Sequence, residues 1–329
     1  MTRFSWAGIC AILTLVLVEV APFAANAEAV QWREIREADV ERINAQLRAG
    51  EPTVDIGIYL PENLDPAFLK TFSVDRFLAE FSNAQEIFAA AGVQLRLAWI
   101  KTGTVAPEYL EIQSNDMNGK TPPGRRVNLY VDSVRQKSSL APEARLAFDS
   151  IVERDELAAR RVHVIILQDV FMSFFEPVDE RTWESRTIST GGLSFPTYSY
   201  HDLPQHLRGV ITVTRNDAGR RLLAHELGHK LINVSHEYRD IAPQHEVRAE
   251  GGLMLYGSGT EIPSGAEGRW HRERLHLSPY VYRVGSDGKR IWNRDYVEGG
   301  HYYDPLYGDL VVRYEPEPVV HPQAVESTR

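Results

Sequence analysis

The chain has 329 residues, of which 43% are hydrophobic and 25% are charged. These values are ordinary for a globular protein that buries a large core. The formal net charge of -9 would repel nucleic acid and anionic membrane surfaces, so it argues against both as main partners.

The first 27 residues have the features of a secretory signal peptide. Arg3 gives a positive start, an apolar run follows over residues 4–24, and residues 25–27 are small enough for a signal peptidase. We predict cleavage after Ala27 and a secreted or periplasmic protein, because Glu19 within the run disfavours an uncleaved anchor helix. No later stretch is comparably apolar, so we expect no stable membrane insertion once the signal is removed.

Hydrophobic periodicity and turn residues predict the elements of the mature chain. We expect a polar leader over residues 28–50 that holds one helix at about 37–48, and a main domain over 51–278. Apolar residues alternate with others over 54–60, which predicts a half-buried opening strand. The later elements are a helix between the N-cap Ser73 and Gly92, strands over 93–99 and 127–131, a helix from near Pro142, a buried strand over 162–167, an edge segment over 191–196 and a strand over 209–214.

The C-terminal part is predicted to be β-rich and then disordered. Residues 279–315 are a β-prone, aromatic extension with a hairpin turn at 286–288, and residues 316–329 are a proline-containing tail. Strands and helices interleave up to residue 214, and helices dominate from there to about 277. The expected fold class is therefore α/β or α+β with a mixed sheet.

The strongest chemical signal is the segment His225–His229, which reads His-Glu-Leu-Gly-His. We expect it on a helix that begins near Asn216 or Asp217, because both are good N-caps. Residues four apart on a helix lie on one face, so the two imidazoles can bind a single Zn²⁺ ion. Glu226, beside the first ligand, can act as the general base for zinc-bound water.

A catalytic zinc ion needs a third protein ligand and one open position. His236 follows His229 by seven residues. In an unbroken helix it would lie about 10 Å further along the axis, so the helix must end before it. Asn233 is suited to a left-handed turn at that point, and chain reversal there could bring His236 back beneath the metal.

These features, together with residues 252–257 (Gly-Leu-Met-Leu-Tyr-Gly), resemble the metzincin clan of zinc peptidases. The resemblance implies a zincin-like fold with an active-site helix, a small helical lower subdomain and a methionine turn that places Met254 below the zinc. Glu237 after the third His, and Tyr256 after the Met, are most similar to the astacin-like branch. That similarity implies that Tyr256 is a fifth ligand or a transition-state donor.

The histidine spacing departs from the clan. The second and third His of that family are six residues apart, whereas His229 and His236 are seven apart. One added helical residue rotates everything after it by about 100°, so the turn would have to absorb the difference. Astacins also have disulfides, whereas the only cysteine here, Cys10, lies in the predicted signal peptide.

Other residues therefore remain candidates for the third zinc ligand. Glu250 lies 21 residues after His229, a separation like that of the gluzincin peptidases. The further candidates are Glu246, His245 and Asp240. A misplaced third ligand would instead leave a zinc-binding module without catalytic activity.

Taken together, these motifs predict an exported zinc-dependent endopeptidase that hydrolyses a peptide or protein substrate. The expected ligands are His225, His229 and His236, and Glu226 is the expected base. The resemblance also implies that the edge segment over 191–196 binds an extended substrate by main-chain hydrogen bonds.

Overall fold

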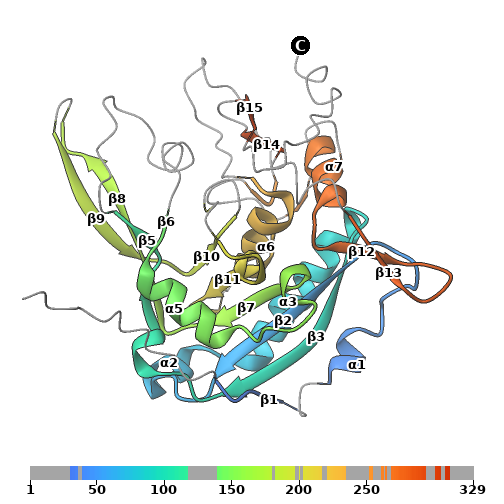
Figure 1. Cartoon of the computed structure of the whole chain (residues 1–329), viewed down its shortest axis with the longest axis horizontal. Helices are drawn as coiled ribbons and strands as arrows, with labels where there is room; N and C mark the ends of the chain where they lie inside the picture. The colour runs from blue at the N-terminus through green and yellow to red at the C-terminus, as the bar shows by residue number, and fades with distance from the viewer. Residues whose placement is uncertain are drawn as a thin grey trace, which may run out of the picture.

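The protein, described here from a computed structural model, has a mixed α/β fold built around one large sheet (Figure 1). The predicted mixed α/β class is confirmed. The structure describes residues 30–35, 39–117, 139–179, 182–196, 200, 203–216, 221–234, 252–254, 261–262, 264, 268–293, 301–304 and 308–311.

Six strands of the main sheet lie in the order β1, β3, β2, β7, β11 and β10. Their bounds in this order are Arg33–Glu34, Gln94–Gly103, Thr53–Pro61, Val162–Ile166, Val210–Val213 and Gly192–Ser194. The four central strands are parallel, and the outer strands β1 and β10 run antiparallel to their neighbours. The strands predicted over 54–60, 93–99, 162–167 and 209–214 are confirmed as the four central strands. The predicted edge segment over 191–196 contains β10.

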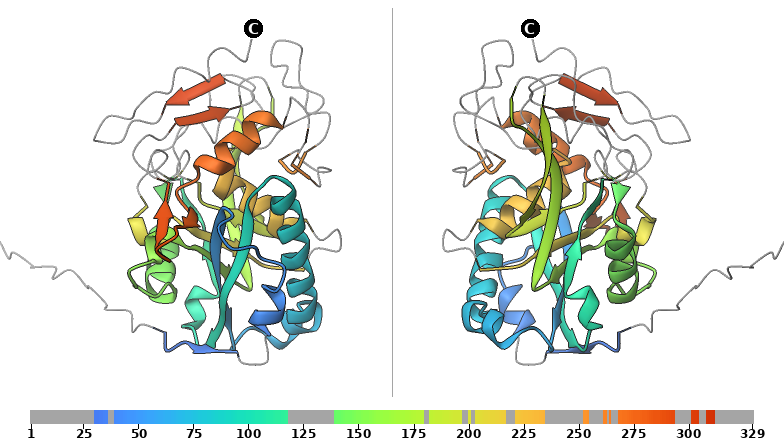
Figure 2. Two further views of the ribbon diagram at one scale, coloured as in Figure 1. Left: turned by 90° about the vertical axis from the view of Figure 1, so that its right-hand side faces the viewer. Right: turned by 90° about the vertical axis from the view of Figure 1, so that its left-hand side faces the viewer.

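Helices cover both faces of this sheet (Figure 2). α3 (Val74–Ala90) packs with α6 (Leu222–Ile232) on one face, and α5 (Pro142–Ile151) lies on the other. The predicted ends of α3 are confirmed, because Ser73 caps its first turn and Gly92 follows it with a φ of 85°. Gly92 can adopt this left-handed conformation without strain because it has no Cβ.

β2 lies at the centre of the sheet, and the prediction that it is half-buried is wrong. Every residue of β2 except Leu60 is buried, including Asp55 and Tyr59. The reason is that a parallel central strand is covered by helices on both faces, whatever the alternation of its residues.

The leader holds a shorter helix than predicted. α1 spans only Val40–Ile43, with Asp39 as its N-cap. The side chain of Asn44 then forms two hydrogen bonds, of 2.8 and 2.9 Å, with the backbone of Leu97 in β3. These bonds hold the leader beside β3, near the end of the main sheet that is opposite to β10.

The other described elements are short helices and strands. They are α2 (Pro66–Thr71), η1 (Pro107–Tyr109), β4 (Glu111–Gln113), β5 (Asn115–Asp116), β6 (Ser139–Leu140), η2 (Ala158–Arg160), η3 (Gln205–Leu207), α7 (Arg269–Leu277), β12 (Val281–Val284), β13 (Arg290–Trp292), β14 (His301–Asp304) and β15 (Gly308–Val311). The predicted strand over 127–131 lies outside the described residues. Of the helices that the structure describes, none is long and apolar enough to cross a membrane.

The C-terminal extension begins with the predicted hairpin. β12 and β13 pair antiparallel, and Gly288 in the turn has a φ of 76°. β12 also pairs antiparallel with the first residues of β2, so the hairpin extends the main sheet. β14 and β15 form a second antiparallel pair.

A second hairpin, β8 (Asp169–Pro177) with β9 (Trp183–Ser189), was not predicted from the sequence. β4 pairs with the start of β8, and the rest of the hairpin projects from the body of the fold, at the upper left of Figure 1. The apolar residues of β8 lie on both of its faces, so it has no period-two signal by which a strand could be found.

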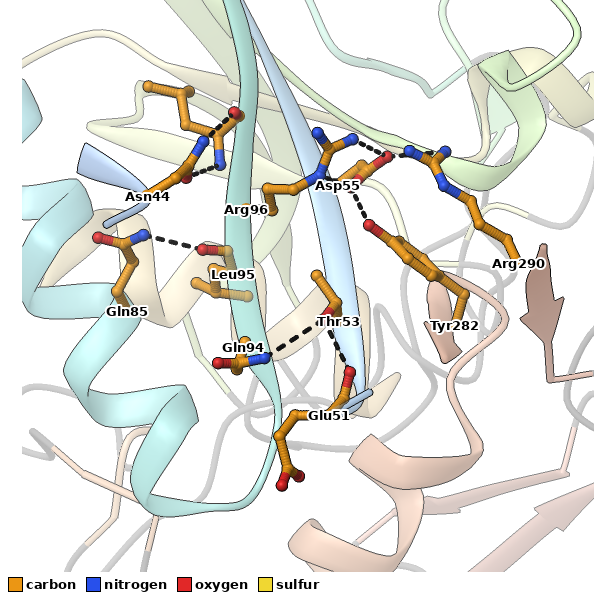
Figure 3. A network of polar contacts seen from close by, with 11 residues as sticks. Asn44, Glu51, Thr53, Asp55, Gln85, Gln94, Leu95, Arg96, Tyr282 and Arg290 are labelled. Carbon is orange, nitrogen blue, oxygen red and sulfur yellow. Dashed lines mark hydrogen bonds and ion pairs between the residues drawn. The ribbon is translucent and has the colours of Figure 1, made fainter. Parts of the chain in front are cut away.

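A buried ionic cluster fastens the C-terminal hairpin to the sheet (Figure 3). Asp55 of β2 is 2% exposed and accepts two hydrogen bonds from Arg96 of β3, at 2.6 and 2.7 Å. Tyr282 of β12 donates a third, at 2.8 Å, and Arg290 of β13 forms an ion pair at 3.0 Å. One carboxylate therefore joins β2, β3, β12 and β13, and removing it would leave two guanidinium groups without their counter-charge.

We predict that Asp55→Asn lowers the free energy of unfolding by about 3 kcal/mol, because it removes the negative partner of a buried ion pair and leaves the arginines in place. The control is Asp287→Asn, which changes an exposed pair with Lys289 in the same hairpin and should alter stability by less than about 0.5 kcal/mol. Urea unfolding of both variants measures the difference, and equal small effects would contradict the role assigned to Asp55.

His163 of β7 is fully buried, and burial lowers its pKa to about 4. Its Nε2 lies 2.9 Å from the carbonyl oxygen of Ala158. The folded protein therefore keeps this ring neutral at a pH where the unfolded chain, with the ordinary pKa of 6.5, binds a proton. The contribution of His163 to the free energy of unfolding is therefore at its full value above pH 6.5 and is lost as the pH falls toward 4.

We predict that lowering the pH from 7 to 5 costs about 2 kcal/mol of stability through His163. His163→Phe removes this contribution while keeping a planar ring beside Tyr59. The measurement is the free energy of unfolding at both pH values for both proteins. The variant should lose about 2 kcal/mol less than the natural protein, and parallel pH profiles would refute the prediction.

Candidate metal centre

The segment His225–His229 lies on α6, as predicted, but the helix starts later than expected. α6 begins at Leu222, and Arg221 stands at its N-cap without a side-chain capping bond. Asn216, one of the two predicted caps, instead accepts a hydrogen bond of 2.6 Å from the backbone amide of Ser73. Its side chain therefore ties the loop before α6 to the start of α3.

The predicted end of this helix is confirmed. Asn233 is the C-cap with φ 57° and ψ 58°, and it is the only described non-glycine residue with a positive φ. Asparagine tolerates this left-handed conformation better than most residues. Arg274 of α7 donates a hydrogen bond of 2.9 Å to the carbonyl of Ile232, so a buried side chain satisfies one of the carbonyls that the end of the helix leaves without an intrahelical partner.

The two imidazoles lie side by side, one turn apart on α6. The ring centroids of His225 and His229 are 4.7 Å apart, with the ring planes at 85°. Nδ1 of His225 lies 2.7 Å from the carbonyl oxygen of Leu253, and Nδ1 of His229 lies 2.6 Å from that of Val234. A carbonyl accepts only from N–H, so Nδ1 carries the proton in each neutral ring and Nε2 is the nitrogen with the lone pair.

Burial lowers the pKa of both histidines, that of His229 to about 3. Both rings are therefore neutral at pH 7, the form in which histidine binds metal ions. Backbone carbonyls at the second ring nitrogen are also the partners that typically fix metal-binding imidazoles. The donor set fits Zn²⁺, which accepts neutral imidazole nitrogen readily.

Met254 packs against the helix between the two histidines. A Cβ added to Gly228 would lie 2.4 Å from the sulfur of Met254 and 3.2 Å from a methyl carbon of Leu253. Met254 itself is 1% exposed. Glycine at this position thus lets the methionine approach the helix backbone, and the same segment presents the Leu253 carbonyl to His225.

Glu226 lies under the edge strand. It is 6% exposed, and burial raises its pKa to about 8, while a hydrogen bond from the Ser194 amide acts in the opposite direction. A Cβ added to Gly192 would lie 3.0 Å from Cγ of Glu226. Gly192 therefore allows β10 to pass directly over the carboxylate.

A buried lysine beside this carboxylate was not recognised from the sequence. Lys230 is 2% exposed, and its Nζ donates hydrogen bonds to the carbonyls of Phe195 (2.5 Å) and Arg208 (2.7 Å). Burial lowers its pKa far below the usual value. Its place four residues after Glu226 was a signal that could have been used, because such residues share a helix face. Lys230 holds the chain after β10, and the loop before β11, onto α6.

The predicted third ligand and the predicted tyrosine are not among these contacts. His236, Tyr256 and the alternative ligand Glu250 lie outside the described residues, as do Glu246, His245 and Asp240. Within the part of the chain that the structure describes, no group of three His, Cys, Asp or Glu residues is placed to hold a metal ion. The structure thus brings together two of the three predicted ligands and the predicted base.

No protein-family model matches this chain, and no curated protein matches it significantly.

We predict that Gly228→Ala and Met254→Ala are coupled. Gly228→Ala alone should cost about 1–3 kcal/mol by overpacking, and Met254→Ala alone about 2–5 kcal/mol by leaving a cavity. In the double variant the methionine that the new methyl group would strike is gone. The combined loss should therefore fall short of the sum by at least about 1 kcal/mol.

Urea unfolding of the metal-free proteins measures this coupling. The control combines Gly228→Ala with Leu69→Ala, an exposed residue on α2, and this pair should be additive within about 0.5 kcal/mol. Additivity of the Gly228 and Met254 changes would show that the close approach has no energetic consequence.

Proposed function

We propose that this protein is an exported zinc-dependent endopeptidase. The observation that carries the proposal is the pair of neutral imidazoles on α6, each oriented at Nδ1 by a backbone carbonyl, with a buried carboxylate beside them. If the two histidines stood on this helix by chance, backbone carbonyls from the segment after α6 would not be expected to contact both rings at Nδ1. Export is proposed from the N-terminal segment, which lies outside the described residues.

His225 and His229 would hold Zn²⁺ through Nε2. The carbonyls of Leu253 and Val234 would keep each ring oriented with its Nε2 toward the ion. When bound, Zn²⁺ would supply a Lewis acid for water and for a carbonyl oxygen, and its charge would favour the ionised form of Glu226. The Glu226 carboxylate would take a proton from the attacking water and pass it to the nitrogen of the departing amine. The Ser194 amide would hold that carboxylate in place during both transfers.

The edge strand supports a peptide as substrate. β10 ends the strand order of the main sheet, and its Ser194 amide contacts Glu226. An extended peptide that paired with the open edge of such a strand would lie beside the carboxylate. Lys230 would keep the strand in place, because it binds the carbonyl of Phe195 directly after β10.

His236 is the proposed third ligand. The chain leaves α6 through the left-handed Asn233, and the next residue, Val234, already contacts His229. Because Val234, two residues after the end of α6, already lies beside His229, a zinc ligand at position 236 is plausible on geometric grounds. The Leu253 contact also brings the chain near Glu250 to the site, so Glu250 is the second candidate. Tyr256 is proposed as an auxiliary group on the resemblance alone.

We predict that Glu226→Gln keeps one Zn²⁺ per chain but lowers peptide hydrolysis by about 10²–10⁴-fold, the usual contribution of a general base. The amide keeps the shape of the side chain and cannot accept the proton. The control, Glu86→Gln on the exposed side of α3, should retain full activity. Metal content by mass spectrometry and cleavage of a fluorogenic peptide are the measurements. Full hydrolysis by Glu226→Gln would rule out the proposed base.

We predict that His236→Ala empties the site and that Glu250→Ala leaves zinc stoichiometric, because only loss of a true ligand should release the ion. Zinc content after dialysis against a weak chelator is the measurement. The reverse result would assign Glu250 as the third ligand. Stoichiometric zinc in the natural protein without hydrolysis of any peptide would favour the inactive zinc-binding module.

A further inference from the structure

Ser194, the last residue of β10, has a buried hydroxyl without a described partner. The residue is 4% exposed, and its Oγ forms no hydrogen bond within the part of the chain that the structure describes. A buried polar atom without a partner costs stability, and native structures contain few of them. Such an atom inside the proposed active site therefore needs an explanation.

The alternation of side chains along the strand directs the Ser194 side chain toward α6. Successive residues of an extended chain face opposite sides of a sheet. Phe195, directly after β10, lies edge-on to Phe148 of α5 with ring centroids 5.1 Å apart, so it faces the side covered by α5. Two residues before Ser194, a Cβ added to Gly192 would lie 3.0 Å from Cγ of Glu226. Both neighbours thus place Ser194 on the face of α6, which packs against β10 (Figure 1).

Two charged side chains of α6 bind the backbone on either side of this hydroxyl. The carboxylate of Glu226 accepts a hydrogen bond from the Ser194 amide. One helical turn later, the amine of Lys230 donates a hydrogen bond of 2.5 Å to the carbonyl of Phe195. Of these two groups, only the carboxylate can accept a hydrogen bond from a hydroxyl, because an ammonium group has no acceptor.

The amide contact brings the Glu226 carboxylate close to the Ser194 side chain. A serine side chain has three staggered rotamers, and two of them place Oγ gauche to its own amide nitrogen. In those rotamers the N–H and the O–H of one serine can point to the same acceptor group. A carboxylate has enough lone pairs to accept both bonds, and a hydroxyl binds an ionised carboxylate strongly. Rotation about one bond, without movement of the backbone, would therefore give the hydroxyl a partner.

We propose that Ser194 is a positioning residue for Glu226. Its hydroxyl turns about χ1 and donates a second hydrogen bond to the ionised carboxylate, beside the bond from its own amide. Two donors fix both the place and the direction of the carboxylate, whereas a single amide lets it pivot. The inference rests on the proposed peptidase function and deepens it. The hydroxyl faces α6 while a peptide would pair with the edge of the strand, so Ser194 acts on turnover and not on substrate binding.

The test compares Ser194→Ala with Ser194→Thr, which keeps the hydroxyl. Ser194→Ala should lower kcat for a fluorogenic peptide about tenfold, the effect of one hydrogen bond to a charged group, and leave KM and zinc content unchanged. Ser194→Thr should retain most of the natural kcat. The matched control is Ser114→Ala between β4 and β5, because Ser114 is also buried with no described partner for its Oγ. This control should change neither kinetic constant.

Urea unfolding of the metal-free proteins separates a positioning role from a structural one. The hydroxyl has no described partner in this structure, so Ser194→Ala should keep or raise the urea midpoint while it lowers kcat. A serine with only a structural role would give a lower midpoint and an unchanged kcat, which would overturn the proposal. A folded, zinc-loaded Ser194→Thr protein that is as slow as Ser194→Ala would also overturn it.

A crystal structure of the zinc-loaded natural protein distinguishes failure of this inference from failure of the peptidase function. Oγ of Ser194 within about 2.7 Å of a Glu226 carboxylate oxygen supports the inference, even if the protein cleaves no peptide. Oγ bound to Lys230 or to water alone would overturn the inference, whereas peptide hydrolysis by the same protein would still support the peptidase. This structure also decides the case if Ser194→Thr does not fold.

Discussion

The orientation of two imidazoles by backbone carbonyls is the contact on which the proposed site depends. Helix geometry alone places His225 and His229 on one face, but it does not decide which ring nitrogen points outward. The carbonyls of Leu253 and Val234 decide it, because each fixes Nδ1 as the protonated nitrogen. Both carbonyls belong to chain that follows α6, so the turn at Asn233 and the packing of Met254 are requirements of the site.

Buried polar groups connect the helix of the proposed site to the edge strand. Glu226 and Lys230 lie on successive turns of one helix, and both are nearly inaccessible to water. An unsatisfied charged group in such surroundings would be strongly destabilising. Each is bound instead to the chain at or after β10, Glu226 by the Ser194 amide and Lys230 by the Phe195 carbonyl. The polar groups of α6 therefore position the edge strand on which a peptide would pair.

The sequence predicted the features that depend on local periodicity and turn chemistry. The central strands, the capped α3 and the left-handed Asn233 are confirmed because apolar spacing and residue conformation determine them directly. The pair of histidines and the neighbouring Glu226 were predicted for the same reason, since they lie within one helical turn.

What the sequence did not predict depends on contacts between distant segments. Asp55 was expected on an exposed face, whereas it is neutralised by Arg96 and by Arg290, which lies 235 positions later in the chain. The spacing of Lys230 from Glu226 indicates only a shared helix face, and the two carbonyls that bind its amine come from distant segments. The hairpin β8–β9 has apolar residues on both faces, so neither strand could be found by alternation.

The central claim is that the imidazoles of α6 bind a metal ion through their outward nitrogens. X-ray absorption at the zinc edge, on the purified full-length chain after mild dialysis, tests it most directly. We expect one zinc per chain, with nitrogen ligands at about 2.0–2.1 Å and the multiple scattering of imidazole, and loss of that signal in His229→Ala. A protein that retains no stoichiometric metal, or whose zinc spectrum is unchanged in His229→Ala, would contradict it.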